Sequence, residues 1–276
     1  MSPTRRAVLA GLASLALPVR LRAQERRVIR RAEHESWIGR RTVSFLCVEG
    51  TGEVAHVLEG SDLGARHRPY GTFEIANALI ALDLGVEDGP DAVREWDRMR
   101  RPSAPHWPAE WRRDHTLASA FATSAPWYFQ DLAVDIGDAF QAYLTRWSYG
   151  TAQGQGDAFW IDGTLEISIV EQVGFLSALS AGALGVSGAA TQITSDISVD
   201  EPISGVPVHG KSGIGPVYGR GLGGPYGGWY VGWMQPPDRP QLTFAVYTEA
   251  TTYREVNDFG RAFSERLLAP ILSGEL

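Results

Sequence analysis

Residues 68–85 read RPYGTFEIANALIALDLG, and this stretch decides how the chain folds. It begins with a proline and a glycine and becomes almost wholly apolar after Glu74, so it predicts a loop that enters a buried helix. Thr72 could cap that helix, and Gly85 could close it. The first turn of such a helix presents free backbone N–H groups, which suit a nucleophile and an oxyanion. Here, however, that turn offers Gly71, which has no side chain, and Glu74, which is a carboxylate.

The composition is that of a soluble globular protein. The chain has 276 residues, of which 44% are hydrophobic and 21% charged, which is enough for one large domain or two small ones. Its formal net charge of −7 argues against nucleic acid as a partner. The single Cys47 excludes an internal disulfide, and its apolar neighbours predict a buried, inert thiol.

The first 23 residues resemble an export signal. Paired arginines, Arg5 and Arg6, precede a short apolar run at residues 10–17, and a cut is expected after Ala23. The pattern resembles a twin-arginine signal; the alternative is an ordinary secretory signal with two chance arginines. The run is too short for a stable membrane anchor, so we expect a periplasmic or secreted protein. Removing residues 1–23 removes four arginines and no acids, which leaves 21 basic and 32 acidic residues, a charge of −11.

The order of the remaining elements predicts an α+β fold, with residues 24–276 as a single domain. One antiparallel sheet is expected from both ends of the chain, flanked by helices, with a helical lobe inserted between its halves. Pro126 fits the first turn of a helix inside that lobe. The expected strands are 41–48, 53–58, 206–213, 228–233 and 241–248, and the expected helical segments are 114–144, 168–184 and 253–272, with a polar excursion at 87–113.

Five short motifs follow one another along the chain with compatible spacing. They are the helix at 72–82, Ser124-Ala125-Pro126, Tyr149-Gly150-Thr151, Phe159-Trp160 and Lys211-Ser212-Gly213. Together they resemble the class D β-lactamases, or oxacillinases, of the penicillin-recognising serine hydrolase fold. Their counterparts there are the Ser-Thr-Phe-Lys helix, Ser-x-Val, Tyr-Gly-Asn, the active-site tryptophan segment and Lys-Thr/Ser-Gly. The resemblance runs from about Val43 to the C-terminus and implies the same fold.

The sequence differs from that family at the two residues that carry out its catalytic chemistry. The resemblance places Gly71 at the nucleophilic serine and Glu74 at the general-base lysine, which works there as a carbamate. An acyl-enzyme needs a side-chain nucleophile activated by a base, and glycine supplies neither oxygen nor sulfur. Glu74 has three interpretations: a carboxylate stabilised by the helix dipole, a shorter anion that mimics the carbamate, or a general base.

The resemblance also implies roles for seven further residues. Ser124 and Lys211 would be catalytic, and the ligand-binding set would be Trp160, Ser212, Gly213, Tyr149 and Arg254. The alternatives are structural: a helix cap for Ser124, a strand-edge hydroxyl for Ser212, core for Trp160 and a solvated side chain for Arg254. Lys211 would be costly to bury alone, so it should pair with Glu74 or hold a ligand carboxylate. No metal or cofactor is expected.

Three functions remain open on the sequence. The first is a class D β-lactamase-like protein that has lost serine-dependent β-lactam hydrolysis and keeps a cleft for β-lactam or peptidoglycan-like ligands. The second is an amide hydrolase in which Glu74 activates a water, or in which a displaced hydroxyl is the nucleophile. The third is a non-catalytic ligand-binding module. Fold analogy alone does not decide among them, and the oligomeric state is open as well.

Overall fold

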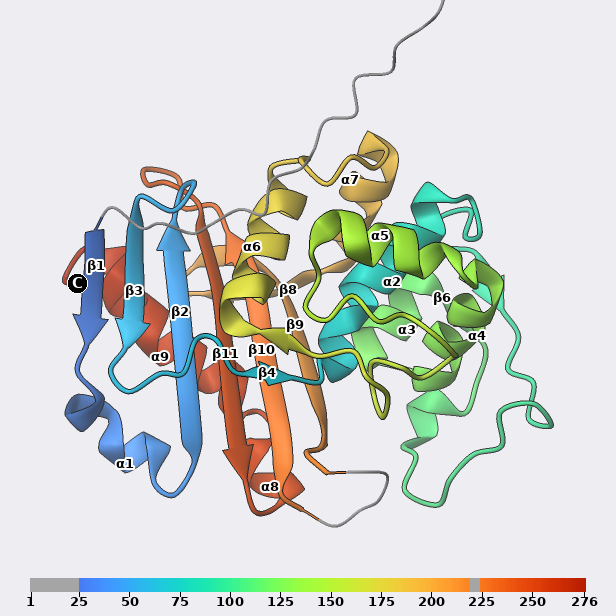
Figure 1. Ribbon diagram of the computed structural model, residues 1–276, viewed down its shortest axis with the longest axis horizontal. Coiled ribbons are helices and arrows are strands. Elements are labelled where there is room, and N and C mark those ends of the chain that lie inside the picture. The colour runs from blue at the N-terminus through green and yellow to red at the C-terminus, as the bar shows by residue number, and fades with distance from the viewer. Residues whose placement is uncertain (1–24, 219–223) are drawn as a thin grey trace, which may run out of the picture.

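The computed structural model describes residues 25–218 and 224–276, and the expected signal at 1–23 lies outside them. A seven-stranded sheet stands on one side of the molecule and a helical lobe on the other (Figure 1). The strand order β1-β3-β2-β11-β10-β9-β8 confirms a sheet assembled from both ends of the chain. Its strands are β1 (Glu25–Ile29), β2 (Thr42–Glu49), β3 (Val54–Leu58), β8 (Val199–Ile203), β9 (Val206–Pro216), β10 (Tyr226–Met234) and β11 (Leu242–Ala250).

Strand pairing is antiparallel through the middle of the sheet and parallel at one edge. The expected hairpin is β2 and β3, with Leu46 opposite Val57. In contrast to the expected antiparallel sheet, β1 runs parallel to β3, with Val28 opposite Val57. The sequence of β1 does not predict a strand, because its arginine-rich residues show no apolar alternation. The expectation therefore holds for every pair in the sheet except this one.

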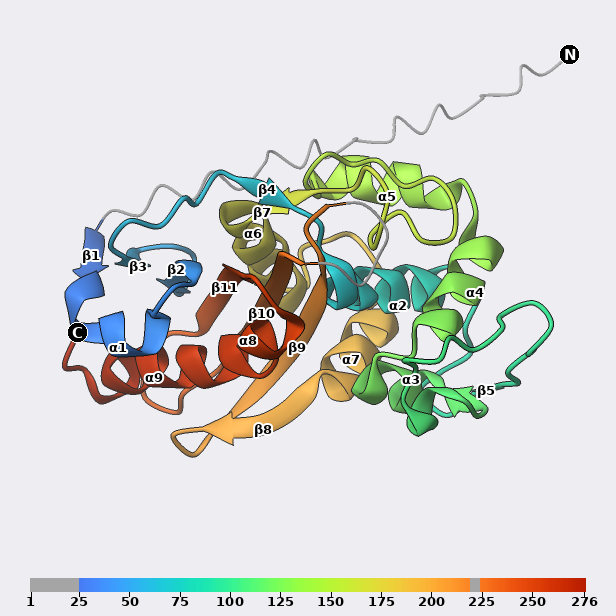
Figure 2. The ribbon, with the colours of Figure 1, turned by 90° about the horizontal axis from the view of Figure 1, so that it is seen from below.

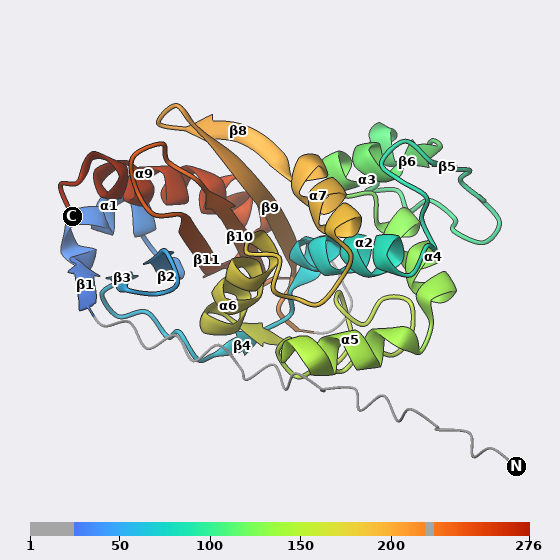
Figure 3. The ribbon, with the colours of Figure 1, turned by 90° about the horizontal axis from the view of Figure 1, so that it is seen from above.

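Helices cover both faces of the sheet, as Figures 2 and 3 show. The terminal helix α9 (Phe259–Ser273) packs on one face, where Phe45 and Phe244 join its Phe263 in a buried cluster. On the opposite face α6 (Ile169–Ser180) packs against alternate residues of the same strands, such as Leu46. Because both faces are covered, the central strands are apolar along most of their length.

The helical lobe lies beyond β9, and α2 (Glu74–Asp83) runs through its centre. Residues 74–81 are all buried, so the apolar stretch is the core helix that its composition predicts. Gly85 follows it with φ +67°, the left-handed conformation expected of a residue that ends a helix. The other lobe helices are α3 (Leu117–Thr123), α4 (Pro126–Ile136), α5 (Ala139–Trp147) and α7 (Gly188–Ile197). Pro126 is in the first turn of α4, as expected.

The remaining elements are short. The single-turn helices are α1 (Glu35–Ile38) and α8 (Tyr253–Val256), the 3-10 turns are η1 (Arg31–His34), η2 (Tyr70–Phe73) and η3 (Ala109–Trp111), and the two-residue strands are β4 (Arg66–His67), β5 (Val93–Arg94), β6 (His115–Thr116) and β7 (Ile167–Ser168). Among the residues described, no helix combines the length and hydrophobicity needed to cross a membrane.

Two local expectations were wrong. Thr72 does not cap α2, because it lies inside the 3-10 turn η2, where its hydroxyl donates to the Pro69 carbonyl and accepts from Gln172. The terminal helix is not continuous either. Asn257 and Asp258 separate α8 from α9, and Asp258 has φ +58°, outside the helical region.

Candidate functional site

The turn η2 and the strand β9 approach each other so closely that a side chain at residue 71 has no room. A Cβ atom built on Gly71 would lie 2.7 Å from the Ser212 carbonyl oxygen and 3.3 Å from the Gly213 Cα. A Cβ on Gly213 would in turn lie 2.7 Å from the Gly71 nitrogen. Two backbones meet here without intervening side chains, which glycine permits and other residues do not. β9 therefore occupies the space that a side chain at residue 71 would need.

One turn further along, Glu74 pairs with Lys211 of β9. The Glu74 Oε2 lies 3.1 Å from the Lys211 Nζ, and both side chains are about 95% buried. The same Nζ donates a short hydrogen bond to the Ser124 Oγ and lies 5.1 Å from the centre of the Phe121 ring. The sequence therefore correctly anticipated that Lys211 would not be buried alone. Glu74, Ser124 and Lys211 form one cluster between α2, the α3–α4 junction and β9.

Burial dominates the electrostatics of Glu74. Loss of water raises the pKa of its carboxyl from 4.5 to about 7, although the ammonium of Lys211 and hydrogen bonds from Lys211 and Ser124 act in the opposite direction. A carboxyl with this pKa changes its ionisation near neutral pH, whereas an exposed glutamate does so near pH 4.

Ser124 is held in an unusual backbone conformation. It ends α3 with φ +50°, and α4 begins two residues later at Pro126. A positive φ is uncommon for any residue other than glycine and costs conformational energy. Its hydroxyl makes no capping bond to α4, whose first turn lacks a side-chain cap. The capping role considered for Ser124 is therefore not what the structure shows; its hydroxyl contacts Lys211 instead.

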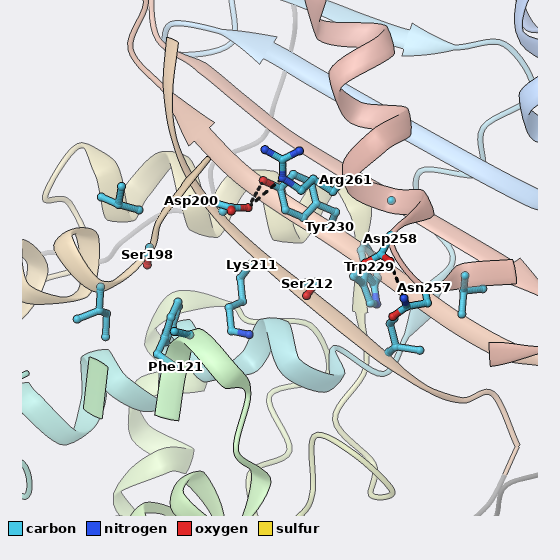
Figure 4. Close-up of a pocket in the computed structure, with 17 residues that line it drawn as sticks. Phe121, Ser198, Asp200, Lys211, Ser212, Trp229, Tyr230, Asn257, Asp258 and Arg261 are labelled. Atoms are coloured by element: carbon cyan, nitrogen blue, oxygen red, sulfur yellow. Dashed lines mark hydrogen bonds and ion pairs between the residues drawn. The ribbon is translucent and has the colours of Figure 1, made fainter. Parts of the chain in front are cut away.

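A cavity of about 330 Å³ lies beside this cluster, along β9 and the start of α9 (Figure 4). Of the site residues expected from the sequence, Lys211 and Ser212 line it, whereas Gly71, Glu74, Ser124 and Gly213 do not. Its apolar wall includes Phe121, Ile214 and Val256. The volume is at the lower end of the range for small-molecule sites.

The charged groups of the cavity are mostly paired within the protein. Asp200 accepts from the Tyr230 hydroxyl at 2.7 Å and lies 3.4 Å from the Arg261 guanidinium, which also donates to the Glu201 carbonyl. In Figure 4 the Lys211 side chain points away from this group. None of these residues was singled out from the sequence, since nothing in their local pattern distinguishes them from surface residues.

The remaining expected ligand-binding residues lie elsewhere. Tyr149 and Trp160 are each only 1% exposed, and both pack against Phe73 in the core. Arg254 is exposed on α8 and lines a separate shallow depression with Trp37. Trp160 thus follows its structural interpretation, and neither aromatic residue lines the cavity.

Comparison with known proteins agrees with this fold. The family model described as "Penicillin binding protein transpeptidase domain" matches residues 65–273. β-Lactamase OXA-10 of Pseudomonas aeruginosa is 36% identical over 173 residues, which cover 60% of this chain and 61% of the relative. The match therefore spans less than two thirds of that relative's own length.

Two solved structures share the architecture. A class D β-lactamase from Sebaldella termitidis has a TM-score of 0.76 at 24% identity, covering 91% of this chain and 99% of its own. The C-terminal domain of the BlaR penicillin-receptor of Bacillus licheniformis has a TM-score of 0.75 at 22% identity, covering 88% and 96%. At these identities the likeness shows the fold alone. The family model covers most of the chain, so the chain belongs to the penicillin-binding protein transpeptidase domain family, and class D β-lactamases are among its relatives.

Proposed function

We propose that this protein has lost the acyl-enzyme chemistry of class D β-lactamases and no longer hydrolyses β-lactams, while it keeps a small-molecule cavity beside β9. The observation that carries the proposal is the contact between Gly71 and β9. Residue 71 has no nucleophilic atom, and the Ser212 carbonyl occupies the space in which one would stand. Removing a nucleophile typically costs several orders of magnitude in rate.

The pairing of Glu74 supports the same proposal. The route in which Glu74 activates a water requires a water-sized gap in front of its carboxylate. Instead, the carboxylate faces the Lys211 ammonium at 3.1 Å and is 4% exposed. A carboxylate beside this lysine restores the negative charge of the family's carbamate, which is the mimicry interpretation of Glu74.

Nitrocefin hydrolysis and intact-protein mass spectrometry test the proposal. Purified protein should open nitrocefin no faster than the buffer blank and should gain no mass after incubation with penicillin. Thermal shift with the same penicillin then reports whether the cavity binds the drug without reacting. Ring opening that follows the protein through two independent purification steps, or a covalent penicillin adduct, contradicts the proposal.

A further inference from the structure

The contacts of Ser124 are those of an activated hydroxyl. Its Oγ receives the short hydrogen bond from the Lys211 ammonium, and its hydroxyl hydrogen-bonds the Glu74 carboxylate. The residue is partly exposed and has the strained backbone φ of +50°. A hydroxyl that contacts both a carboxylate and a buried cation has a proton acceptor and a stabilising charge at hand.

We infer that Ser124 is a displaced nucleophile, which accepts acyl groups from uncharged esters that enter through the cavity beside β9. This goes beyond the proposed function, which concerns residue 71 and β-lactams. The cavity reaches the cluster through Lys211 and through Phe121, which lies one helical turn before Ser124. Ser124 does not itself line the cavity, so an ester has to pass the Lys211 side chain to reach its hydroxyl.

The chemical step balances with the groups present. The Ser124 Oγ bonds to the ester carbonyl carbon while its proton passes to the Glu74 carboxylate, and the carbonyl π pair moves to oxygen. The adjacent Lys211 ammonium stabilises the negative charge that develops. When the C=O bond re-forms, the ester C–O bond breaks and the leaving alkoxide takes the proton from Glu74. The products are an alcohol and an acylated Ser124.

The charges of the cavity select an uncharged acyl group. Its two cations are already engaged, Lys211 by Glu74 and Arg261 by Asp200. Asp258, which also lines the cavity, adds a further carboxylate. A ligand carboxylate would thus meet acids and no available cation, whereas an apolar acyl chain meets Phe121 and its neighbours.

The ionisation of Glu74 fits this role. With its pKa raised to about 7 by burial, the carboxyl is a better proton acceptor than an ordinary glutamate and is still ionised above neutral pH. The acylation rate should therefore increase as the pH rises through about 7 and level off above it. Gln at residue 74 keeps the shape but accepts no proton, so it should slow acylation about 100-fold.

Two matched substrates and two variants test the inference on the full chain. The substrates are p-nitrophenyl butyrate and mono-p-nitrophenyl succinate, which differ mainly in the terminal carboxylate. Diisopropyl fluorophosphate is the reagent for mapping the adduct by peptide mass spectrometry. Ser124→Gly removes the oxygen and suits the positive φ, so it should fold; Thr123→Val removes the neighbouring hydroxyl, which bonds only within α3.

The expected result is one phosphoryl adduct, on Ser124, in the parent chain and in Thr123→Val. Ser124→Gly should lose the adduct and slow p-nitrophenol release from the butyrate ester at least tenfold at pH 8. The butyrate ester should react about tenfold faster than the succinate ester. An unmodified Ser124, or equal rates in Ser124→Gly and the parent, overturns the inference and leaves the proposed function standing. A penicillin adduct or nitrocefin turnover instead contradicts the proposed function, whichever residue carries it.

Discussion

Gly71→Ser puts back the oxygen that the class D family uses, and we expect it to weaken the fold without restoring activity. The new Cβ would stand 2.7 Å from the Ser212 carbonyl oxygen, about 0.7 Å short of the ordinary contact that begins at 3.4 Å. The obstacle is backbone in a central position of β9 rather than the end of a flexible side chain. The strand or the turn must therefore move.

Two opposing effects set the change in the free energy of unfolding of Gly71→Ser. Overpacking of this kind costs about 1–3 kcal/mol in the free energy of unfolding. Replacing a glycine at a compatible φ returns about 0.4–1 kcal/mol, because the unfolded chain has less freedom. The net loss is about 1–2 kcal/mol, which lowers the melting temperature by roughly 2–8 °C for a chain of this size.

Urea unfolding followed by tryptophan fluorescence measures the change, with Gly174→Ala as the matched control. Gly174 lies inside α6, and a Cβ there would meet no atom within 4 Å. The control should gain about 0.5–1 kcal/mol, since alanine is the better helix former. A Gly71→Ser protein as stable as the parent, or one that penicillin acylates at residue 71, would show that β9 leaves room for a side chain and refute the reasoning.

Four further experiments probe the core and the charge cluster. Lys211→Met leaves Glu74 buried and unpaired, so urea unfolding at pH 8 should show a loss of about 3–5 kcal/mol, shrinking at pH 5, where Glu74 is protonated. In the parent chain the pKa of Glu74 is raised from 4.5 to about 7. Its contribution to the free energy of unfolding is therefore fully present below pH 4.5 and is lost as the pH rises through 7, by up to about 3 kcal/mol. A free energy of unfolding that increases with pH across this window contradicts the assignment. Trp160→Ala should lower the free energy of unfolding by about 3–5 kcal/mol in the same urea assay. A change in ligand affinity with unchanged stability would instead show that Trp160 belongs to the ligand site. Burial raises the pKa of the Cys47 thiol, so Ellman's reagent should react with it only after denaturation, and rapid reaction of the native protein would be the opposite result.

The sequence predicts the fold well wherever one residue period dominates. The β2–β3 hairpin, the buried α2 and the three C-terminal strands all carry strong apolar patterns, and all are present. The parallel edge strand β1 and the break at Asn257 and Asp258 were not predicted. Their sequences are polar, and they take their conformation from the elements they pack against rather than from local propensity.

The site divides in the same way. The pairing of Glu74 with Lys211 could be anticipated, because a buried lysine needs a counter-charge. The closure over Gly71 could not, since it depends on a distance to β9, a strand far along the chain. The place of Arg254 depends on where α8 ends, and a short helix at the surface has no sequence signal strong enough to fix its rotation.

The pairing of β2 with β11 has a consequence for biosynthesis. The β2–β3 hairpin is made early, but β11, its neighbour in the sheet, emerges from the ribosome only after the whole helical lobe has been translated. Until then the apolar β2 lacks a partner on that side and the helix α9 that covers it. The nascent polypeptide should therefore depend on chaperones and acquire protease resistance only after β11 and α9 have emerged.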